Sequence, residues 1–297
     1  MKTKTLLFLI FAFLGISLVK QVNAQTSWDR SMLPIIGEGY RNIFYMGGET
    51  GRKVYYVEFD LVKKESVREI RKTLNAGQKY EVVVWGDFRI KDIGISTYKK
   101  NSSGEWTLVV KDNETDYLSK LSFSSVNSEE FKFEIACEPQ KGFDGGHYGF
   151  CIVQLESGSS YAEVSTLPVF SLYDVNRKTI GGFEKSENKF EVVHLEFGII
   201  KKGVPTETIR MLVTDWGVYG LLADATDKIV PEVDLCFYKK NYNDGRWELV
   251  FKSNETKQYE SYAQKIYATD EYKISVVPTE FESGYSEGYY SLIIYHR

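Results

Sequence analysis

One stretch of this chain occurs twice, about 140 residues apart, far more than the roughly 20–50 residues of solenoid or propeller repeats. The repeated elements are Tyr98-Lys99-Lys100-Asn101, Trp106 and Asn113-Glu114-Thr115, which return as Tyr238-Lys239-Lys240-Asn241, Trp247 and Asn254-Glu255-Thr256. A period of this length corresponds to a whole domain. The repeat therefore predicts two tandem domains of the same fold.

Apolar and polar residues alternate with a period of two in both copies, which is typical of half-buried β-strands. In the first copy we expect strands near 54–59, 70–74, 80–84, 93–97, 106–110, 118–123, 131–135 and 148–155. In the second copy we expect them near 192–197, 209–213, 219–223, 233–237, 247–251, 259–266, 272–276 and 289–295. No helical period is evident over ten or more residues, and residues 26–53 are expected to supply an edge strand and a loop. The pattern predicts an all-β protein of two tandem antiparallel β-sandwich domains.

The N-terminus has the features of an export signal. Lys2 and Lys4 precede the apolar run Leu6–Val19, and Val22-Asn23-Ala24 places signal-peptidase cleavage before Gln25. An uncleaved anchor is the alternative, but the run is short for a membrane span. We therefore expect a signal peptide at 1–24, a first domain at 25–157 and a second at 158–297, with Ser157–Ser160 as linker. The mature chain, without a membrane span, is expected in a bacterial periplasm or outside the cell.

The charge pattern argues against a nucleic-acid partner. The formal net charge is −4, and Lys and Glu are mixed along the chain without a basic stripe that would neutralise phosphates.

Three cysteines remain after export, so at least one is unpaired. Cys137 and Cys151 fall on consecutive expected strands, and a disulfide between them is one interpretation. Small buried thiols are the other.

Several segments resemble the bacterial pre-peptidase C-terminal domain family. Ala76-Gly77-Gln78-Lys79-Tyr80, the following aliphatic strand, a Gly-containing hairpin and a last strand led by Tyr148-Gly149 resemble that family over roughly 68–155, and more weakly over 207–296. The resemblance implies a small jelly-roll-like β-sandwich and allows calcium or polymer binding. Members of the family often carry an Asp on the middle aliphatic strand. Asp234 occupies that position in the second copy, whereas Gly94 occupies it in the first copy. The family is often appended to hydrolases, and we expect no such domain in this chain.

The residues offer little for catalysis. The three histidines are His147, His194 and His296, and no zinc-protease, serine-hydrolase or phosphate-loop motif occurs. His147 with Asp144 could form an acid–base pair, but a solvated loop histidine is the simpler interpretation. We expect no enzyme.

Strand parity predicts that loops 86–91, 112–116 and 138–147 share one end of the sandwich, where acidic residues gather. In the second copy Asp224, Asp227, Glu232 and Asp234 are close in sequence and offer the oxygen ligands that calcium prefers. An ordinary acidic surface is the alternative.

Aromatic residues also cluster at this predicted end and could stack on sugar rings or anchor a protein. The candidate ligand-binding residues are Phe143, Tyr148, Phe281, Tyr285 and Tyr289. The alternative is that about half of them fill the core. We interpret Trp106 and Trp247 as packing residues of a duplicated core.

The sequence therefore predicts an exported, non-enzymatic binding or adhesion protein that takes a glycan or protein at the loop end. A structural or assembly subunit of a surface or periplasmic complex, without a small ligand, is the alternative. An unrecognised hydrolase would need a cleft with converging Asp and His side chains.

Overall fold

A computed structural model describes residues 31–47, 52–155, 167–187, 190–213, 217–226, 229–253 and 257–297. The expected signal peptide and the Ser157–Ser160 linker lie outside the described residues. None of the described helices is both long enough and apolar enough to cross a membrane.

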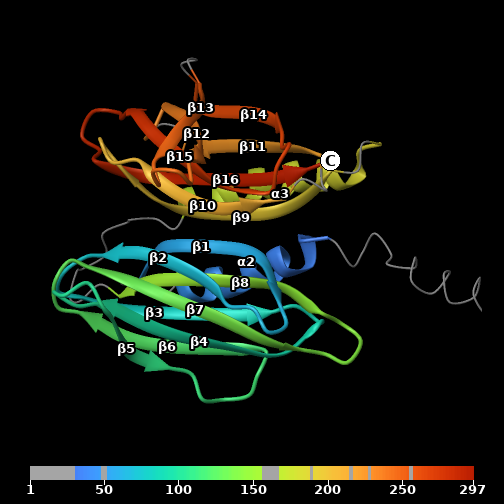
Figure 1. Ribbon diagram of the computed structural model, residues 1–297. Helices are drawn as coiled ribbons and strands as arrows, with labels where there is room; N and C mark the ends of the chain where they lie inside the picture. The colour runs from blue at the N-terminus through green and yellow to red at the C-terminus, as the bar shows by residue number, and fades with distance from the viewer. Residues whose placement is uncertain are drawn as a thin grey trace, which may run out of the picture. The chain divides into compact units, whose positions relative to one another are not determined.

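Eight strands make up each half of the chain (Figure 1). The first half contains β1 (Arg52–Lys63), β2 (Arg68–Leu74), β3 (Gln78–Gly86), β4 (Ile90–Lys100), β5 (Trp106–Lys111), β6 (Leu118–Ser125), β7 (Glu129–Pro139) and β8 (Gly145–Leu155). The second contains β9 (Glu191–Lys201), β10 (Thr206–Leu212), β11 (Val218–Ala225), β12 (Glu232–Lys240), β13 (Trp247–Lys252), β14 (Tyr259–Lys265), β15 (Asp270–Glu280) and β16 (Glu287–His296). All sixteen expected strands are present, and the all-β prediction is confirmed.

The strands form three antiparallel sheets. One sheet has eight strands in the order β14-β11-β16-β9-β1-β8-β3-β6, and two sheets have four, in the orders β2-β7-β4-β5 and β10-β15-β12-β13. Each half repeats the same strand order. The large sheet is continuous because β1 pairs with β9, with Glu58 opposite Glu196. The two halves thus share a sheet, which the expectation of two separate sandwiches did not include; the domain boundary and the common origin of the halves stay predictions.

Both small sheets pack on the same face of the large sheet. An apolar core lies between each small sheet and the large sheet, so each half has one. Fully buried core residues are Tyr80, Phe133 and Phe150 in the first half, and Leu235, Phe237 and Leu292 in the second. Burial of these side chains is the main stabilising contribution of each sandwich.

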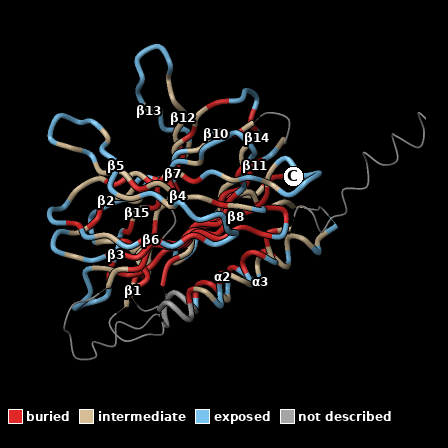
Figure 2. The backbone as a smooth tube through the Cα atoms, turned by 90° about the horizontal axis from the view of Figure 1, so that it is seen from below, coloured by how far each residue is buried: buried red, intermediate tan, exposed pale blue. Residues whose placement is uncertain are grey.

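Two helices cover the opposite face of the large sheet (Figure 2). They are α2 (Leu33–Gly47) and α3 (Leu167–Lys185), and their apolar side chains, including Ile36 and Tyr173, pack against Phe59, Trp85 and Phe197. The expectation of a strand and loop over 26–53 and of no helix was wrong. The sequence did carry a signal: Ser31-Met32-Leu33-Pro34 and Ser165-Thr166-Leu167-Pro168 both place Pro in a first helical turn, where its missing N–H has no cost.

The cysteines do not pair. Cys137, Cys151 and Cys236 are free thiols. Cys137 lies on β7 of a small sheet and Cys151 on β8 of the large sheet, where it faces the helices. Burial raises the pKa of Cys137 to about 11. The disulfide interpretation is therefore wrong for this structure.

Candidate functional site

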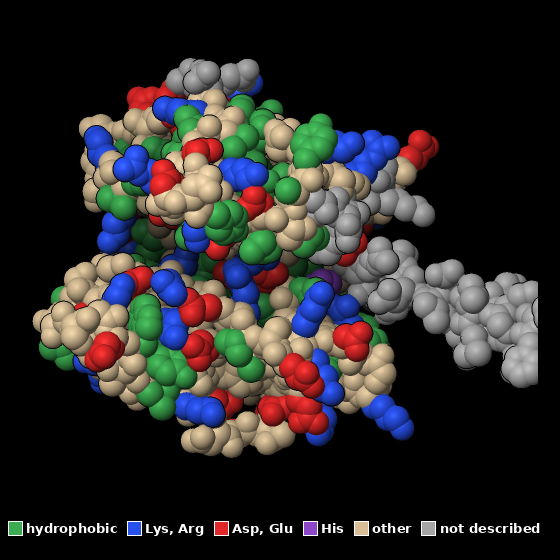
Figure 3. Space-filling view, viewed as in Figure 1, with side chains coloured by type: hydrophobic (Ala, Val, Ile, Leu, Met, Phe, Trp, Pro, Cys, Tyr) green, Lys and Arg blue, Asp and Glu red, His purple; other side chains and the backbone are tan. Residues whose placement is uncertain are grey.

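A groove of about 580 Å³ runs between the two halves (Figure 3). Strands β2 and β10 each form one edge of a small sheet, and the groove lies between them over the junction of β1 and β9. Its lining residues are Tyr56, Glu58, Arg68, Glu69, Ile70, Arg71, Lys72, Glu196, Glu207, Thr208, Ile209, Lys240, Gly245, Trp247 and Glu271. The groove exists because the two halves share a sheet, so a sequence reading of independent domains could not find it.

Its floor is formed by Tyr56 and Glu58 of β1 and Glu196 of β9. The two glutamates are direct cross-strand partners, and both are buried. The Tyr56 hydroxyl lies 2.7 Å from Glu58 Oε2 and 2.8 Å from Glu196 Oε2. Since a phenol carries one proton, Tyr56 donates to one carboxylate at a time.

Further donors surround both carboxylates. Tyr148 and the Arg68 guanidinium donate to Glu58 Oε1 at 2.5 and 3.2 Å. Thr208 and Tyr290 donate to Glu196 Oε1 at 2.6 and 2.8 Å. Burial and the nearby carboxylates raise the pKa of Tyr56, Tyr148 and Tyr290 well above the usual value, so all three hydroxyls remain protonated donors.

Asp60 extends this buried network toward the second half. It forms ion pairs with Arg68 at 3.3 Å and with Arg210, and it lies 3.4 Å from His194 Nδ1. Burial alone would raise the pKa of Asp60, but the charges of Arg210 and Arg68 hold it well below its usual value. Burial and Arg210 would lower the pKa of His194, yet the carboxylates of Asp60 and Glu196 on either side of the ring outweigh them and raise it. The network therefore favours the protonated form of the His194 imidazole, which lies between the carboxylates of Asp60 and Glu196.

Glu58, His194 and Glu196 are the described residues whose ligand atoms approach one another closely enough to hold a metal ion, within 4.8 Å. Every carboxylate oxygen of the two glutamates, however, already has a side-chain donor: Tyr56 at Glu58 Oε2, His194 at Glu196 Oε2 (3.0 Å), and the four donors named above at the two Oε1 atoms. Two guanidinium groups also lie beside the cluster. This chemistry is that of a buried ion-pair network rather than of a cation site.

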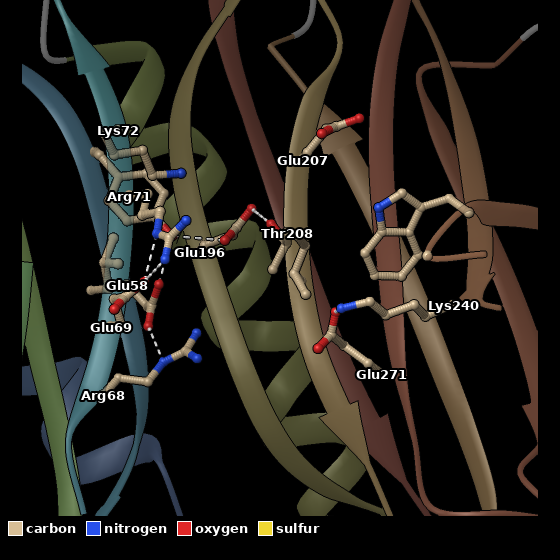
Figure 4. A pocket seen from close by; sticks show the side chains of 15 residues that line it. Glu58, Arg68, Glu69, Arg71, Lys72, Glu196, Glu207, Thr208, Lys240 and Glu271 are labelled. Carbon is tan, nitrogen blue, oxygen red and sulfur yellow. Dashed lines mark hydrogen bonds and ion pairs between the residues drawn. The ribbon is translucent and has the colours of Figure 1, made fainter. Parts of the chain in front are cut away.

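The walls and rim come from the edge strands and from the outer face of the second small sheet (Figure 4). On one side, Lys72 of β2 lies over the Tyr56 ring, its Nζ 3.5 Å from the ring centre. On the other, the half-buried Trp247 ring has Lys240 Nζ 5.7 Å from its centre, and Lys240 pairs with Glu271 at 2.8 Å. The groove thus combines the accessible part of the Trp247 ring with charged hydrogen-bonding groups.

Trp106 and Trp247 belong to none of the buried apolar clusters of the described residues. Both are half-buried and lie beside lysine ammonium groups, Lys132 at Trp106 and Lys273 at Trp247. Their interpretation as core residues was wrong. Only Trp247 lines the groove.

The predicted clustering of the first-half loops is confirmed. The Asp87 amide donates to the His147 carbonyl at 3.0 Å, and the Ile93 amide donates to the Asp116 carbonyl at 2.9 Å. His147 is not solvated as expected: it is buried, with Arg89 2.7 Å from its Nδ1.

The five predicted ligand-binding aromatics separate into two groups. Phe143 and Tyr285 are exposed, and Phe143 packs edge-on against Phe88 with ring centres 5.9 Å apart. Tyr148, Phe281 and Tyr289 are buried. Tyr289 donates to the Val54 carbonyl at 3.0 Å. These three fill the interior and offer no surface to a ligand, as the alternative interpretation expected of about half.

The predicted calcium ligands lie apart from any metal-holding cluster of the described residues. Asp234 pairs with Lys252 at 3.0 Å, Glu232 accepts from Thr279 at 3.4 Å, and Asp224 accepts from the Ala225 amide at 2.8 Å. Asp227 lies outside the described residues. Calcium binding stays a prediction without support from this geometry.

Comparisons with known proteins do not place the chain in a family. No protein-family model matches it, and no curated protein matches it. The resemblance to the pre-peptidase C-terminal family therefore stays an expectation.

Solved structures show only distant similarity. PBSX exported protein XepA is 10% identical, with 82% of this chain and 86% of that chain covered and a TM-score of 0.26. The CBM22-1–CBM22-2 tandem domain of Xyn10C from Paenibacillus barcinonensis is 10% identical, with 86% and 96% covered and a TM-score of 0.24. PliG from Aeromonas hydrophila, a periplasmic inhibitor of g-type lysozyme, is 7% identical, with 34% and 86% covered and a TM-score of 0.25. Similarity at this level assigns no function.

Proposed function

We propose that this protein is an exported, non-catalytic glycan-binding protein whose ligand lies in the groove between the two halves. The observation that carries the proposal is the lining of the groove. The half-buried Trp247 ring offers an aromatic face for a sugar ring, and charged groups beside it, such as Lys240 and Glu271, can orient sugar hydroxyls. Export rests on the N-terminal sequence.

A binding role fits the groove better than catalysis. Each carboxylate that lines the groove is held by a basic side chain or buried among donors, for example Glu69 by Arg71 at 2.5 Å and Glu207 by Lys273 at 2.8 Å. A general acid or base must exchange its proton with the substrate at working pH. The depressed pKa of Glu196 keeps that group ionised instead.

The test compares two tryptophans that occupy matching positions of the repeat. Binding to a panel of soluble polysaccharides is measured by affinity electrophoresis and calorimetry. We expect Trp247→Ala to weaken binding at least about tenfold, a loss of about 1.4 kcal/mol, because the variant removes an aromatic wall of the groove. Trp106→Ala, which changes the same residue type outside the groove, should bind like the unmodified protein.

Two other results would contradict the proposal. If no polysaccharide binds, glycan recognition is wrong. If Tyr285→Ala abolishes binding while Trp247→Ala does not, the ligand lies at the loop end and the groove is wrong.

An assembly role is the second candidate, because both small sheets end in an apolar edge strand. Leu108 and Val109 on β5, and Leu249 and Val250 on β13, are all exposed. Unpaired edge strands can add a strand from another chain. If this role is correct, light scattering will detect a stable oligomer that Leu108→Lys with Leu249→Lys dissociates; a monomeric unmodified protein would contradict it.

A further inference from the structure

The charged residues that line the groove are almost all paired. Five carboxylates and four basic side chains contribute to the lining. Arg68 pairs with Glu58, Arg71 with Glu69 and Lys240 with Glu271, while Glu196 contacts His194 and Glu207 contacts Lys273. One charged residue that lines the groove belongs to none of these pairs.

That residue is Lys72. Its ammonium group has no hydrogen-bond or ion-pair partner within the described parts of the chain, and it lies against the face of the Tyr56 ring, 3.5 Å from the ring centre. In Figure 4 the side chain extends from β2 into the groove, and no interaction is drawn to its nitrogen. An aromatic face attracts a cation but does not accept its three N–H groups as an anion does.

Each carboxylate of the network below Lys72 already has another cation in direct contact, and the charge of Lys72 helps to lower the pKa of Glu196 without an ion pair. The carboxylates of Glu58, Asp60 and Glu196 are matched by the guanidinium groups of Arg68 and Arg210 and by the protonated imidazole of His194. Burial lowers the pKa of Lys72, and the charges of Glu196 and Glu58 only partly offset that effect. An unpaired, desolvated ammonium group is costly, and an arriving anion would remove that cost.

We propose that the groove selects acidic glycans, whose anionic substituent accepts hydrogen bonds from the Lys72 ammonium group. This inference rests on the proposed function and adds the chemical class of the ligand. A uronate carboxylate and a sulfate ester share the required chemistry. The Thr208 hydroxyl lines the opposite wall, but it is already committed to Glu196, so Lys72 is the group that remains available for the substituent.

The experiment uses the full-length mature protein and two pairs of polymers. Polygalacturonate is compared with its methyl-esterified form, and dextran sulfate with dextran, so that each pair differs in its anionic group. We expect the protein to bind at least one acidic polymer at least about tenfold more tightly than its neutral counterpart. Preference for one of the two acidic polymers identifies the anion as carboxylate or sulfate.

Lys72→Met keeps the length of the side chain and removes its charge. It should abolish the preference for the acidic polymer while leaving binding of the neutral polymer, where measurable, unchanged. Lys240→Met is the matched control, because Lys240 also lines the groove but is already paired with Glu271. It should retain the preference. A thermal unfolding curve of each variant shows that it is folded.

The outcomes separate this inference from the function on which it rests. Equal binding of acidic and neutral polymers, with Trp247→Ala weakening both, overturns acidic selectivity and leaves glycan binding intact. Equal losses in Lys72→Met and Lys240→Met would mean non-specific charge attraction, which also overturns it. If no polymer of either kind binds, both proposals fail.

Discussion

Glu196 illustrates how a single residue depends on both halves of the molecule. It lies on β9, but it accepts a hydrogen bond from Tyr56 of β1 as well as from Thr208 and Tyr290 of its own half. Its side chain is almost completely buried. The carboxylate therefore stabilises the junction only while every donor around it stays in place.

We predict that Glu196→Ala lowers the free energy of unfolding by about 3–5 kcal/mol, because it leaves buried donors and the cations beside them unpaired. Urea denaturation measures the change. Glu207→Ala is the control: its side chain is 50% exposed and forms an ion pair with Lys273, so we expect a loss of less than about 1 kcal/mol. Similar losses in the two variants would contradict the assigned network.

The same residues determine how stability depends on pH. The pKa values of Glu58, Asp60 and Glu196 are lowered in the folded state, chiefly because nearby basic groups outweigh burial. Their stabilisation is complete above the usual carboxyl pKa of about 4 and is lost as the pH falls through the folded values. The raised pKa of His194 acts in the opposite sense: its contribution is complete below about 6.5 and is lost as the pH rises through the folded value.

We therefore predict that the urea midpoint is highest in mildly acidic solution and falls steeply below about pH 4. Midpoints measured from pH 2 to 9 test this. Glu196→Gln should flatten the acid limb, and His194→Gln the decline above neutral pH. A midpoint that does not change between pH 5 and 2 would show that these carboxylates are not paired in the folded protein.

At the scale of the elements, glycines permit close packing on both faces of the large sheet. A Cβ on Gly149 of β8 would lie 2.2 Å from the Trp85 indole ring, whereas a Cβ on Gly94 of β4 would meet no atom within 4 Å. Trp85 itself is fully buried under the helices. The two positions are therefore a matched pair for testing the fit.

We predict that Gly149→Ala lowers the free energy of unfolding by about 1–3 kcal/mol, since Trp85 must move within a packed core. Gly94→Ala should be neutral or stabilise by up to about 1 kcal/mol, because alanine restricts the unfolded chain more than glycine does. Chemical denaturation of both variants is the measurement. A destabilised Gly94→Ala variant would mean that the packing around β4 is not as described.

The strands could be predicted from the sequence because their signal is local. In β7, Phe131, Phe133 and Ile135 alternate with charged residues, and this alternation alone marks a half-buried strand. Helix α2 was missed because Gly37 and Gly39 lower its helix propensity, although Gly39 is where α2 approaches Phe59 and Trp85.

The groove could not be predicted in the same way. It depends on the pairing of β1 with β9, and nothing within either strand states which strand will be its neighbour. Glu58, Asp60, His194 and Glu196 at the centre of otherwise apolar strands were the available signal, because buried charged residues require partners. The loop-end aromatics were easier to notice, yet three of the five pack inside.

At the scale of the whole molecule, the shared sheet predicts that the two halves unfold together. Separating them would leave β1 and β9 each without one of its two neighbouring strands, and it would break the contacts of Asp60 with Arg210 and His194. Both helices also pack into one apolar cluster that contains strands of both halves. We therefore predict one cooperative transition, with tryptophan fluorescence and far-ultraviolet circular dichroism giving coincident curves.

The Gly149→Ala variant makes this prediction sharper. Gly149 lies on β8 in the first half. Trp247 lies on β13 in the second half, and His296 lies on β16 of the same half, which pairs with β11. If the halves are coupled, the substitution shifts the hydrogen-exchange protection of β11 and β16 as much as that of β3 and β8. Protection lost only in the first half, or two resolved unfolding transitions, would show that each half is stable by itself. The groove would then be a cleft between independently folding bodies rather than a feature of one continuous sheet.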